Sequence, residues 1–272
     1  MKMAPFVFLV LILAGLGFCT TTRTTGQYAK INGIRIFYRL YGEGEPLLLL
    51  HGGMGSSDSF KSQVDFFAKE YSVITPDSRG HGRTSDGDQL ISYQLMADDM
   101  FKLLDHLGID SVYVVGKSDG GNTGLIMAIS YPERIRKLIA IGSNSRPEGT
   151  KDDYMDMISR MTAETAGRNI IENYESLAPD PHHFSIFFEK VKTMWLSAPN
   201  ISQEQLTSIK VPTLLVVGDG DIIKLDHTVE LFESIPNAQL CVVPGSSHYV
   251  LDERPELLNG IINEFIKAPV QK

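Results

Sequence analysis

The sequence predicts an α/β fold, in which a mostly parallel sheet carries an antiparallel hairpin at its N-terminal edge and a small helical lid. Short, continuously apolar runs alternate with helical patterns along most of the chain, which is typical of strands covered by helices on both faces. An alternating stretch with a turn signal precedes this rhythm, and a strand-free segment interrupts it. The 272 residues, 43% of them hydrophobic, suffice for one substantial core.

The hairpin is expected at residues 28–42. Two alternating stretches are joined there by Asn32 and Gly33, the dipeptide that most strongly favours a two-residue hairpin turn. The two strands should therefore pair antiparallel and form an edge of the sheet.

Strands and helices are then expected to alternate as far as Ser145, so that 27–145 forms the first part of the core. The apolar runs predict the strands, and the amphipathic stretches between them predict the helices. The expected strands are 46–50, 71–76, 112–115 and 136–143, and the expected helices are 59–70, 92–108 and 120–130.

The rhythm stops at residues 146–205, which show helical patterns and no strand pattern. An all-helical insertion between two halves of one sheet predicts a lid. The core is expected to resume over 206–272, with strands at 211–218 and 238–245 and helices at 226–235 and 255–267. Most of the large apolar side chains of the lid are expected to pack within it and a few to line a pocket, the set being Met155, Met157, Met161, Phe184, Phe187, Phe188, Met194 and Trp195.

Residues 1–26 are expected to be a signal peptide and a polar tether. Lys2 precedes an apolar stretch over 4–18 that is short for a membrane-spanning helix and typical of a secretory signal. The expected location is therefore periplasmic or extracellular, without a membrane span in the mature form. LGFC resembles a lipobox, in which Cys19 would carry a lipid anchor, although Phe18 departs from that pattern. A membrane-anchored lipoprotein is the alternative, as is an uncleaved anchor.

Composition excludes several classes of function. The net charge of −8 and the absence of a basic cluster argue against nucleic-acid or anionic-membrane partners, since both require clustered Lys and Arg. Two cysteines make no disulfide framework, and Cys241 is interpreted as a buried strand residue. No metal-binding His or Cys spacing occurs, so neither a metal nor a cofactor is expected.

The stretch VYVVGKSDGG at 112–121 makes Ser118 the candidate nucleophile. A sharp strand-to-helix turn holds its central residue in a sparsely populated backbone region and persists only where nothing beside it clashes. Gly116 and Gly120 remove the clashing Cβ atoms. This G-x-S-x-G arrangement is the nucleophile elbow.

A serine hydroxyl needs a base and an orienting carboxylate to act as a nucleophile. Asp219 and Asp221 follow the predicted strand 211–218, and His248 follows the next strand. Loops after the carboxyl ends of parallel strands gather at one edge of a sheet. Ser118, one of the two aspartates and His248 are therefore expected to meet there.

These motifs in this order resemble the α/β-hydrolase fold family over nearly all of the chain after about residue 28. The resemblance implies that Ser118 attacks, His248 is the base and Asp221, rather than the turn-forming Asp219, orients it. It also implies an oxyanion hole made by the backbone N–H groups of Gly53 and Asp119. The matching motifs are HGGMGSS at 51–57, DSRGHGRTS at 77–85, GKSDGG at 116–121, GDGD at 218–221 and GSSHYVLDERPE at 245–256.

Asp119 belongs to a short run that resembles one group of members within this family. The Ser-Asp-Gly-Gly run resembles the valacyclovirase-like (biphenyl hydrolase-like) members, which implies that this carboxylate holds the α-amino group of a substrate. The simpler interpretation is electrostatic, because an acidic side chain in the first turn of a helix is favoured by the helix dipole.

The sequence therefore predicts a serine hydrolase that cleaves a small-molecule carboxylic ester through a Ser-His-Asp triad and an acyl-enzyme, with α-amino acid esters as the sharper hypothesis. Three alternatives within enzymes are a proline-iminopeptidase-like aminopeptidase, a lactonase and a carbon–carbon bond hydrolase. A non-catalytic ligand receptor on the same fold is the alternative from another class.

The remaining polar residues of the motifs are interpreted as structural. Asp77 and Arg79 are expected to form an internal charge pair that orders their turn, and Lys117 is expected to be a solvated neighbour of the elbow. The histidines outside the triad are interpreted as surface or structural residues, namely His81, His106, His182, His183 and His227.

Overall fold

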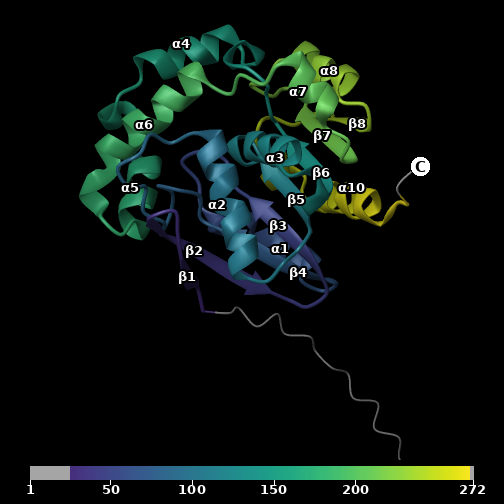
Figure 1. The fold of residues 1–272 in the computed structure, drawn as a ribbon. Coiled ribbons are helices and arrows are strands. Elements are labelled where there is room, and N and C mark those ends of the chain that lie inside the picture. Colours follow the sequence, from purple (N-terminus) through teal and green to yellow (C-terminus); the bar gives the residue numbers. More distant parts are fainter. Residues whose placement is uncertain (1–24, 270–272) are drawn as a thin grey trace, which may run out of the picture.

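The computed structural model describes residues 25–269, so the predicted signal peptide and Cys19 lie outside the described residues. One eight-stranded sheet in the order β1-β2-β4-β3-β5-β6-β7-β8 forms the centre of the fold (Figure 1). The strands are β1 Gln27–Ile31, β2 Ile34–Tyr41, β3 Glu45–Leu50, β4 Tyr71–Pro76, β5 Val112–Lys117, β6 Ile135–Ile141, β7 Thr213–Gly218 and β8 Ala238–Val243.

The predicted fold class is confirmed. Strands β1 and β2 pair antiparallel, and Asn32 and Gly33 take the positive φ values of 47° and 80° that a type I′ turn requires. Strand β2 runs antiparallel to β4, whereas the pairs from β4 through β3, β5, β6 and β7 to β8 are parallel. The hairpin is thus the antiparallel edge of an otherwise parallel sheet.

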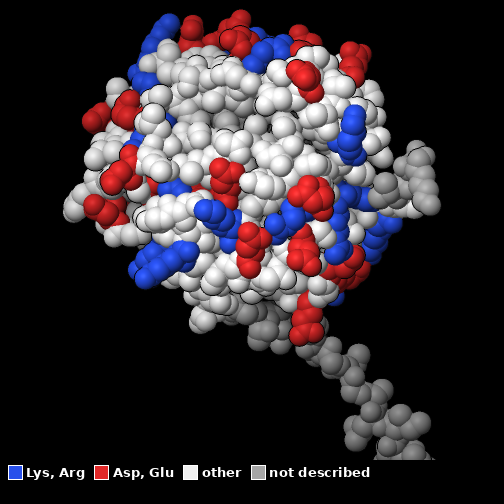
Figure 2. All heavy atoms as spheres, viewed as in Figure 1, with Lys and Arg blue, Asp and Glu red and all other residues white. Residues whose placement is uncertain are grey.

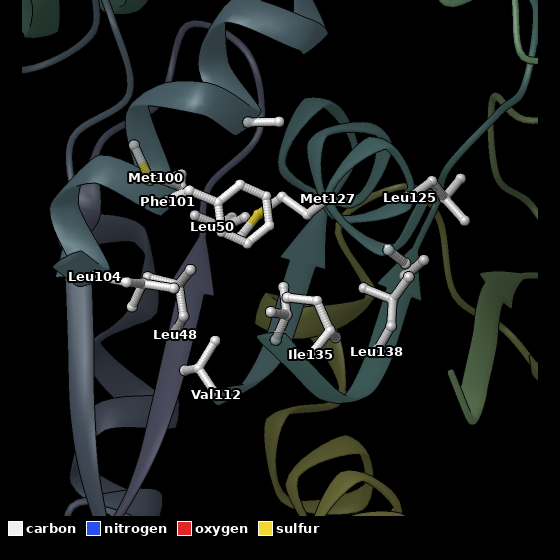
Figure 3. Close-up of a cluster of buried hydrophobic side chains, with 14 of the residues drawn as sticks. Leu48, Leu50, Met100, Phe101, Leu104, Val112, Leu125, Met127, Ile135 and Leu138 are labelled. Atoms are coloured by element: carbon white, nitrogen blue, oxygen red, sulfur yellow. The ribbon is translucent and has the colours of Figure 1, made fainter. Parts of the chain in front are cut away.

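Helices cover both faces of the sheet, which is why the strands are continuously apolar. Figure 3 shows one face, where Met100 and Phe101 of α2 and Met127 of α3 pack on Leu48 and Leu50 of β3. On the other face α1 and α10 pack against the sheet. The helices of the core are α1 Lys61–Phe67, α2 Tyr93–His106, α3 Asp119–Ser130, α8 Leu225–Ser234, α9 Val250–Glu253 and α10 Pro255–Lys267.

Helices α4 to α7 lie between β6 and β7 in the chain, and α4, α5 and α6 form an arc along one side of the molecule (Figure 1). A separate apolar cluster joins Phe184, Phe187 and Phe188 of α6 to Tyr93 and Met96 at the start of α2. The arc is thereby fixed to the core. Its helices are α4 Asp152–Arg160, α5 Arg168–Leu177, α6 Phe184–Ser197 and α7 Gln203–Ser208.

The first turn of this arc is joined to the loop that follows β7. Thr150 and Ile223 form an isolated antiparallel bridge. Lys151 donates its backbone N–H to the carbonyl of Ile222 at 2.8 Å, and Lys224 donates its own to the carbonyl of Gly149 at 2.8 Å. The segment 149–151 and the loop 222–224 are therefore held in one fixed arrangement.

The predicted pair between Asp77 and Arg79 is wrong. Arg79 reaches across to α2, where its Nε and Nη2 donate to the two carboxylate oxygens of Asp99 at 2.8 and 2.7 Å. Asp77 instead accepts the backbone N–H groups of Ser57 and Arg83, each at 2.7 Å. The long guanidinium finds its bidentate partner on a helix, and the short aspartate orders the turn through backbone amides.

Cys241 is only half-buried rather than buried, because β8 is the last strand of the sheet and has a neighbour on one side only.

The face seen in Figure 2 carries Asp and Glu interspersed with Lys and Arg, and the net charge of the chain is −8. Within residues 25–269, no helix combines the length and the apolar character that crossing a membrane requires.

Candidate active site

Ser118 lies on the turn between β5 and α3, with φ 53° and ψ −119°. A non-glycine residue at positive φ is strained and persists only where its surroundings hold it. A Cβ atom on Gly116 would collide with the carbonyl oxygen of Gly120, and one on Gly120 would collide with that of Leu50. The two glycines therefore allow the close backbone approach that places Ser118 at the end of the strand.

Asp221 and His248 meet on the loops after β7 and β8. His248 Nδ1 lies 2.7 Å from Asp221 Oδ1, and the carboxylate is 1% exposed. The backbone N–H of Ile223 donates to the same oxygen at 2.9 Å. With Nδ1–H donating to the carboxylate, His248 Nε2 is left as an acceptor.

Asp219 lies apart from this pair. Its carboxylate accepts the backbone N–H of Ser246 at 3.2 Å, and hydrogen bonds from the backbone of Gly245 and Ser246 lower its pKa. These contacts close the turn after β7.

Gly142, after β6, leaves the room that the imidazole of His248 occupies. A Cβ atom there would lie 2.9 Å from both Cε1 and Nδ1 of His248 and 3.2 Å from Asp221 Oδ2. The residue has φ 58°, which glycine adopts without strain. Three strand ends of the parallel sheet thus enclose the histidine and its carboxylate.

Ser118 and His248 line one cavity of about 600 Å³ that also includes Gly53 and Asp119. The hydroxyl of Ser118 makes no hydrogen bond with any other residue from 25 to 269, so its proton is available to an acceptor in the cavity. Hydrogen bonds between nucleophile and base are often long before substrate binds. Four of the five predicted site residues therefore line this cavity, and the fifth, Asp221, is buried behind it in contact with His248.

His51 fixes the peptide that carries the N–H of Gly53. Its Nε2 accepts the backbone N–H of Ser78 at 2.9 Å, so its proton lies on Nδ1, which is 2.7 Å from the carbonyl oxygen of Gly52. That carbonyl and the N–H of Gly53 belong to the same peptide plane. Burial lowers the pKa of His51 and keeps this ring neutral, so one tautomer orients the peptide.

The backbone N–H groups of Gly53 and Asp119 donate to no other part of the described chain. Asp119 is the first residue of α3, where a helix leaves its N–H groups without internal partners. Two such donors beside a nucleophile are what a developing oxyanion requires.

The carboxylate of Asp119 is held by neutral donors. The Tyr93 hydroxyl donates to it at 2.8 Å, and Trp195 Nε1 donates to both oxygens at 3.1 and 2.9 Å. Burial raises the pKa of Asp119, and these hydrogen bonds act in the opposite direction. No Lys, Arg or His among residues 25–269 forms an ion pair with it.

Sequence reasoning missed Tyr93, Tyr154 and the contact made by Trp195. All three line the cavity, and burial raises the pKa of Tyr154, so its phenol stays protonated. No local pattern marks Tyr93, since it reads as an ordinary residue of an amphipathic helix.

The five histidines interpreted as surface or structural do not line the cavity, and no group of three or more His, Cys, Asp or Glu over 25–269 is arranged to hold a metal ion.

Comparisons with known proteins show what the chain is similar to. Residues 45–173 match the model of the family described as alpha/beta hydrolase fold. The chain is 30% identical over 279 residues to the 2-hydroxy-6-oxo-6-phenylhexa-2,4-dienoate hydrolase of Burkholderia cepacia, covering 89% of this chain and 96% of the relative. It is 26% identical to a Haemophilus influenzae protein named as an esterase/lipase, covering 81% and 82%.

Among solved structures, the enol-lactonase from Burkholderia xenovorans superposes with a TM-score of 0.72 at 20% identity, covering 89% of this chain and 100% of that one. Identity at this level shows a shared fold.

Proposed function

The chain belongs to the α/β-hydrolase fold family, and from that membership we propose that it is a serine hydrolase that cleaves small carboxylic esters. The observation that carries the proposal is the 2.7 Å contact between His248 Nδ1 and Asp221 Oδ1 beside the cavity that Ser118 lines. In a Ser-His-Asp triad, the carboxylate fixes the tautomer of the histidine, and the histidine takes the proton of the serine.

In the proposed mechanism Ser118 Oγ attacks the ester carbonyl while His248 Nε2 takes its proton. Asp221 stabilises the imidazolium that forms. The N–H groups of Gly53 and Asp119 hold the oxyanion of the tetrahedral intermediate, each contributing roughly 3 kcal/mol in comparable sites. As the carbon–oxygen bond breaks, His248 returns the proton to the alcohol. Water then attacks the acyl-enzyme with the same base and releases the acid.

The proposal is tested with p-nitrophenyl acetate and a fluorophosphonate probe. The wild-type protein is expected to release p-nitrophenol and to be labelled at Ser118, whereas the Ser118→Ala variant does neither. A folded wild-type protein that turns over no ester and takes no label contradicts an enzymatic role and favours a ligand receptor on the same fold.

We further propose that the acyl group carries an α-amino substituent. Asp119 is 4% exposed, lines the cavity and has only neutral partners, so an ammonium group would offset the cost of burying its charge. The hydrogen bonds from Tyr93 and Trp195 already satisfy part of this carboxylate, which limits the gain.

The amino-group proposal predicts that Asp119→Asn lowers hydrolysis of a phenylalanyl ester much more than that of its 3-phenylpropanoyl analogue. The asparagine keeps the backbone N–H at the oxyanion, so the second ester is the internal control. Equal loss on both esters contradicts the amine contact.

A carbon–carbon bond hydrolase is the second candidate, because the relative at 30% identity is named as a dienoate hydrolase. Both reactions need the same nucleophile and base. The discriminating measurement is decay of the absorbance of a 2-hydroxy-6-oxo-dienoate compared with ester turnover by the same protein.

Export stays a proposal that rests on Lys2 and the apolar stretch 4–18. Mass spectrometry of the protein isolated from its own cells would distinguish cleavage, a lipid on Cys19 and a retained N-terminus.

A further inference from the structure

Lys117 is not the solvated residue that its position next to the nucleophile suggested. It is the last residue of β5, and its side chain is only 13% exposed. The side chain lines the same cavity as Ser118 and His248. A partly buried cation thus precedes the nucleophile in the chain and shares its cavity.

The ammonium of Lys117 has only weak partners. Nζ lies 3.5 Å from Asp252 Oδ2 and 4.6 Å from the centroid of the Tyr249 ring, and it donates no hydrogen bond to any other residue between 25 and 269. An ammonium carries three donors, and polar groups that are removed from water normally have their hydrogen bonds satisfied. Lys117 therefore retains donor capacity toward the cavity.

Asp252 does not use up that capacity. Its side chain is 60% exposed, and an ion pair with an exposed carboxylate at this separation contributes little. The aspartate can turn into solvent at small cost when another anion approaches the ammonium. Tyr249 is also 60% exposed, so both neighbours lie at the open side of the cavity.

The position of Lys117 indicates which part of an ester it faces. Tyr249 and Asp252 follow His248 in the chain, line the cavity and are the neighbours of the ammonium. Because His248 returns its proton to the leaving oxygen, the alcohol portion lies on the side of the histidine. The acyl portion is then left to the region under the arc, where Trp195 and Asp119 lie.

We propose that Lys117 is a specificity-determining residue that binds a carboxylate carried by the alcohol portion of the substrate. The proposal rests on the ester hydrolysis proposed above and adds the chemical class of the leaving group. The competing role is structural, in which Lys117 only fixes α9 and the loop of His248 through Asp252 and Tyr249.

Binding without turnover tests the site by itself. Trp195 is the single tryptophan of the chain and lines the cavity, so its fluorescence in the Ser118→Ala protein reports occupancy. We expect 4-hydroxybenzoate to bind roughly tenfold more tightly than neutral 4-hydroxybenzamide, as for a partly exposed hydrogen bond to a charged group. Lys117→Met in the same background should remove the difference. Equal affinities in the Ser118→Ala protein would overturn the proposal.

Turnover of the matched esters 4-carboxyphenyl acetate and 4-carbamoylphenyl acetate gives a second test. Lys117→Met is expected to lower kcat/KM roughly tenfold on the charged ester and much less on the neutral one. Lys61→Met is the control for the loss of one positive charge near the cavity, because Lys61 is exposed and follows the cavity residue Phe60. Equal loss on both esters would mean a structural role and would also overturn the proposal.

Asp252→Asn separates the two roles further. Removal of the competing carboxylate should tighten 4-hydroxybenzoate binding if Lys117 is a binding residue, whereas a purely structural pair predicts no gain. If neither acetate ester is hydrolysed by the wild-type protein, the proposed function fails, and the fluorescence measurement still decides the role of Lys117.

Discussion

Trp195 on α6 donates its indole N–H to both carboxylate oxygens of Asp119, at 3.1 and 2.9 Å. Asp119 directly follows Ser118 and begins α3, so a helix of the arc is hydrogen-bonded to the residue whose own N–H faces the candidate oxyanion site. The position of α6 is thereby coupled to the geometry of the elbow.

Trp195→Phe should destabilise the protein, because a 4% exposed carboxylate loses its indole donor and the smaller phenyl ring fills only part of the space that the indole occupied. We expect the free energy of unfolding to fall by about 1–3 kcal/mol, measured by urea denaturation. Tyr93→Phe is the matched control and should cost less, since the indole continues to serve both oxygens. Equal stability of wild type and Trp195→Phe would argue against the coupling.

Asp221→Asn should lower kcat by about 10⁴ with little change in stability, because the amide no longer favours the tautomer in which Nε2 of His248 is free to accept a proton. The measurement is kcat on p-nitrophenyl acetate. Asp219→Asn is the companion variant and should retain most of the activity, since Asp219 only closes the turn with Ser246. Comparable losses at the two positions would contradict the proposal that Asp221, and not Asp219, orients His248.

Gly142→Ala should lower kcat by about 10², the loss that a misplacement of roughly 1 Å produces, because the new Cβ would displace the imidazole of His248. Gly108→Ala controls for backbone strain. Gly108 has φ 68° and nothing within 4 Å of an added Cβ, so it shares the strain without the collision. The rates of the two variants on one ester, with their unfolding free energies, separate the two effects.

Acid should destabilise the protein through His81. Burial lowers the pKa of this histidine from 6.5 to about 3. Between these values the unfolded chain holds a proton that the folded protein does not, so the free energy of unfolding decreases as pH falls from 6.5, by up to about 1.4 kcal/mol per pH unit.

The contribution of His81 is isolated by comparing wild type with His81→Gln between pH 4.5 and 6.5. The variant should show a shallower dependence of unfolding free energy on pH by about one proton. The same substitution at the exposed His106 is the control. Parallel curves for wild type and His81→Gln would contradict the assignment.

Local patterns predicted the sheet and its helices closely. The expected strand 71–76 is β4 and the expected helix 255–267 is α10, with the same bounds. Continuous apolar runs and a proline at the first helical position are signals carried by a few adjacent residues. The candidate site was also foreseen to the extent that it depends on topology, because parallel strands deliver their carboxyl ends to one edge.

The contacts that the sequence did not predict join residues far apart in the chain. Arg79 finds Asp99 rather than Asp77, and Trp195 finds Asp119 across 76 positions. Which side chain a guanidinium or an indole reaches depends on how helices pack on the sheet. Neither periodicity nor spacing encodes that arrangement.

The bridge between Thr150 and Ile223 sets where this protein can be recombined with its relatives. Segment 149–151 and loop 222–224 are joined by backbone hydrogen bonds, and that loop begins next to Asp221. A chimera that imports a foreign helical arc must therefore import or preserve both halves of this junction together. A single crossover within α5 or α6 takes the two halves from different parents and can shift the loop that carries Asp221. A pair of crossovers, one in α5 and one in α6, keeps both halves from the same parent.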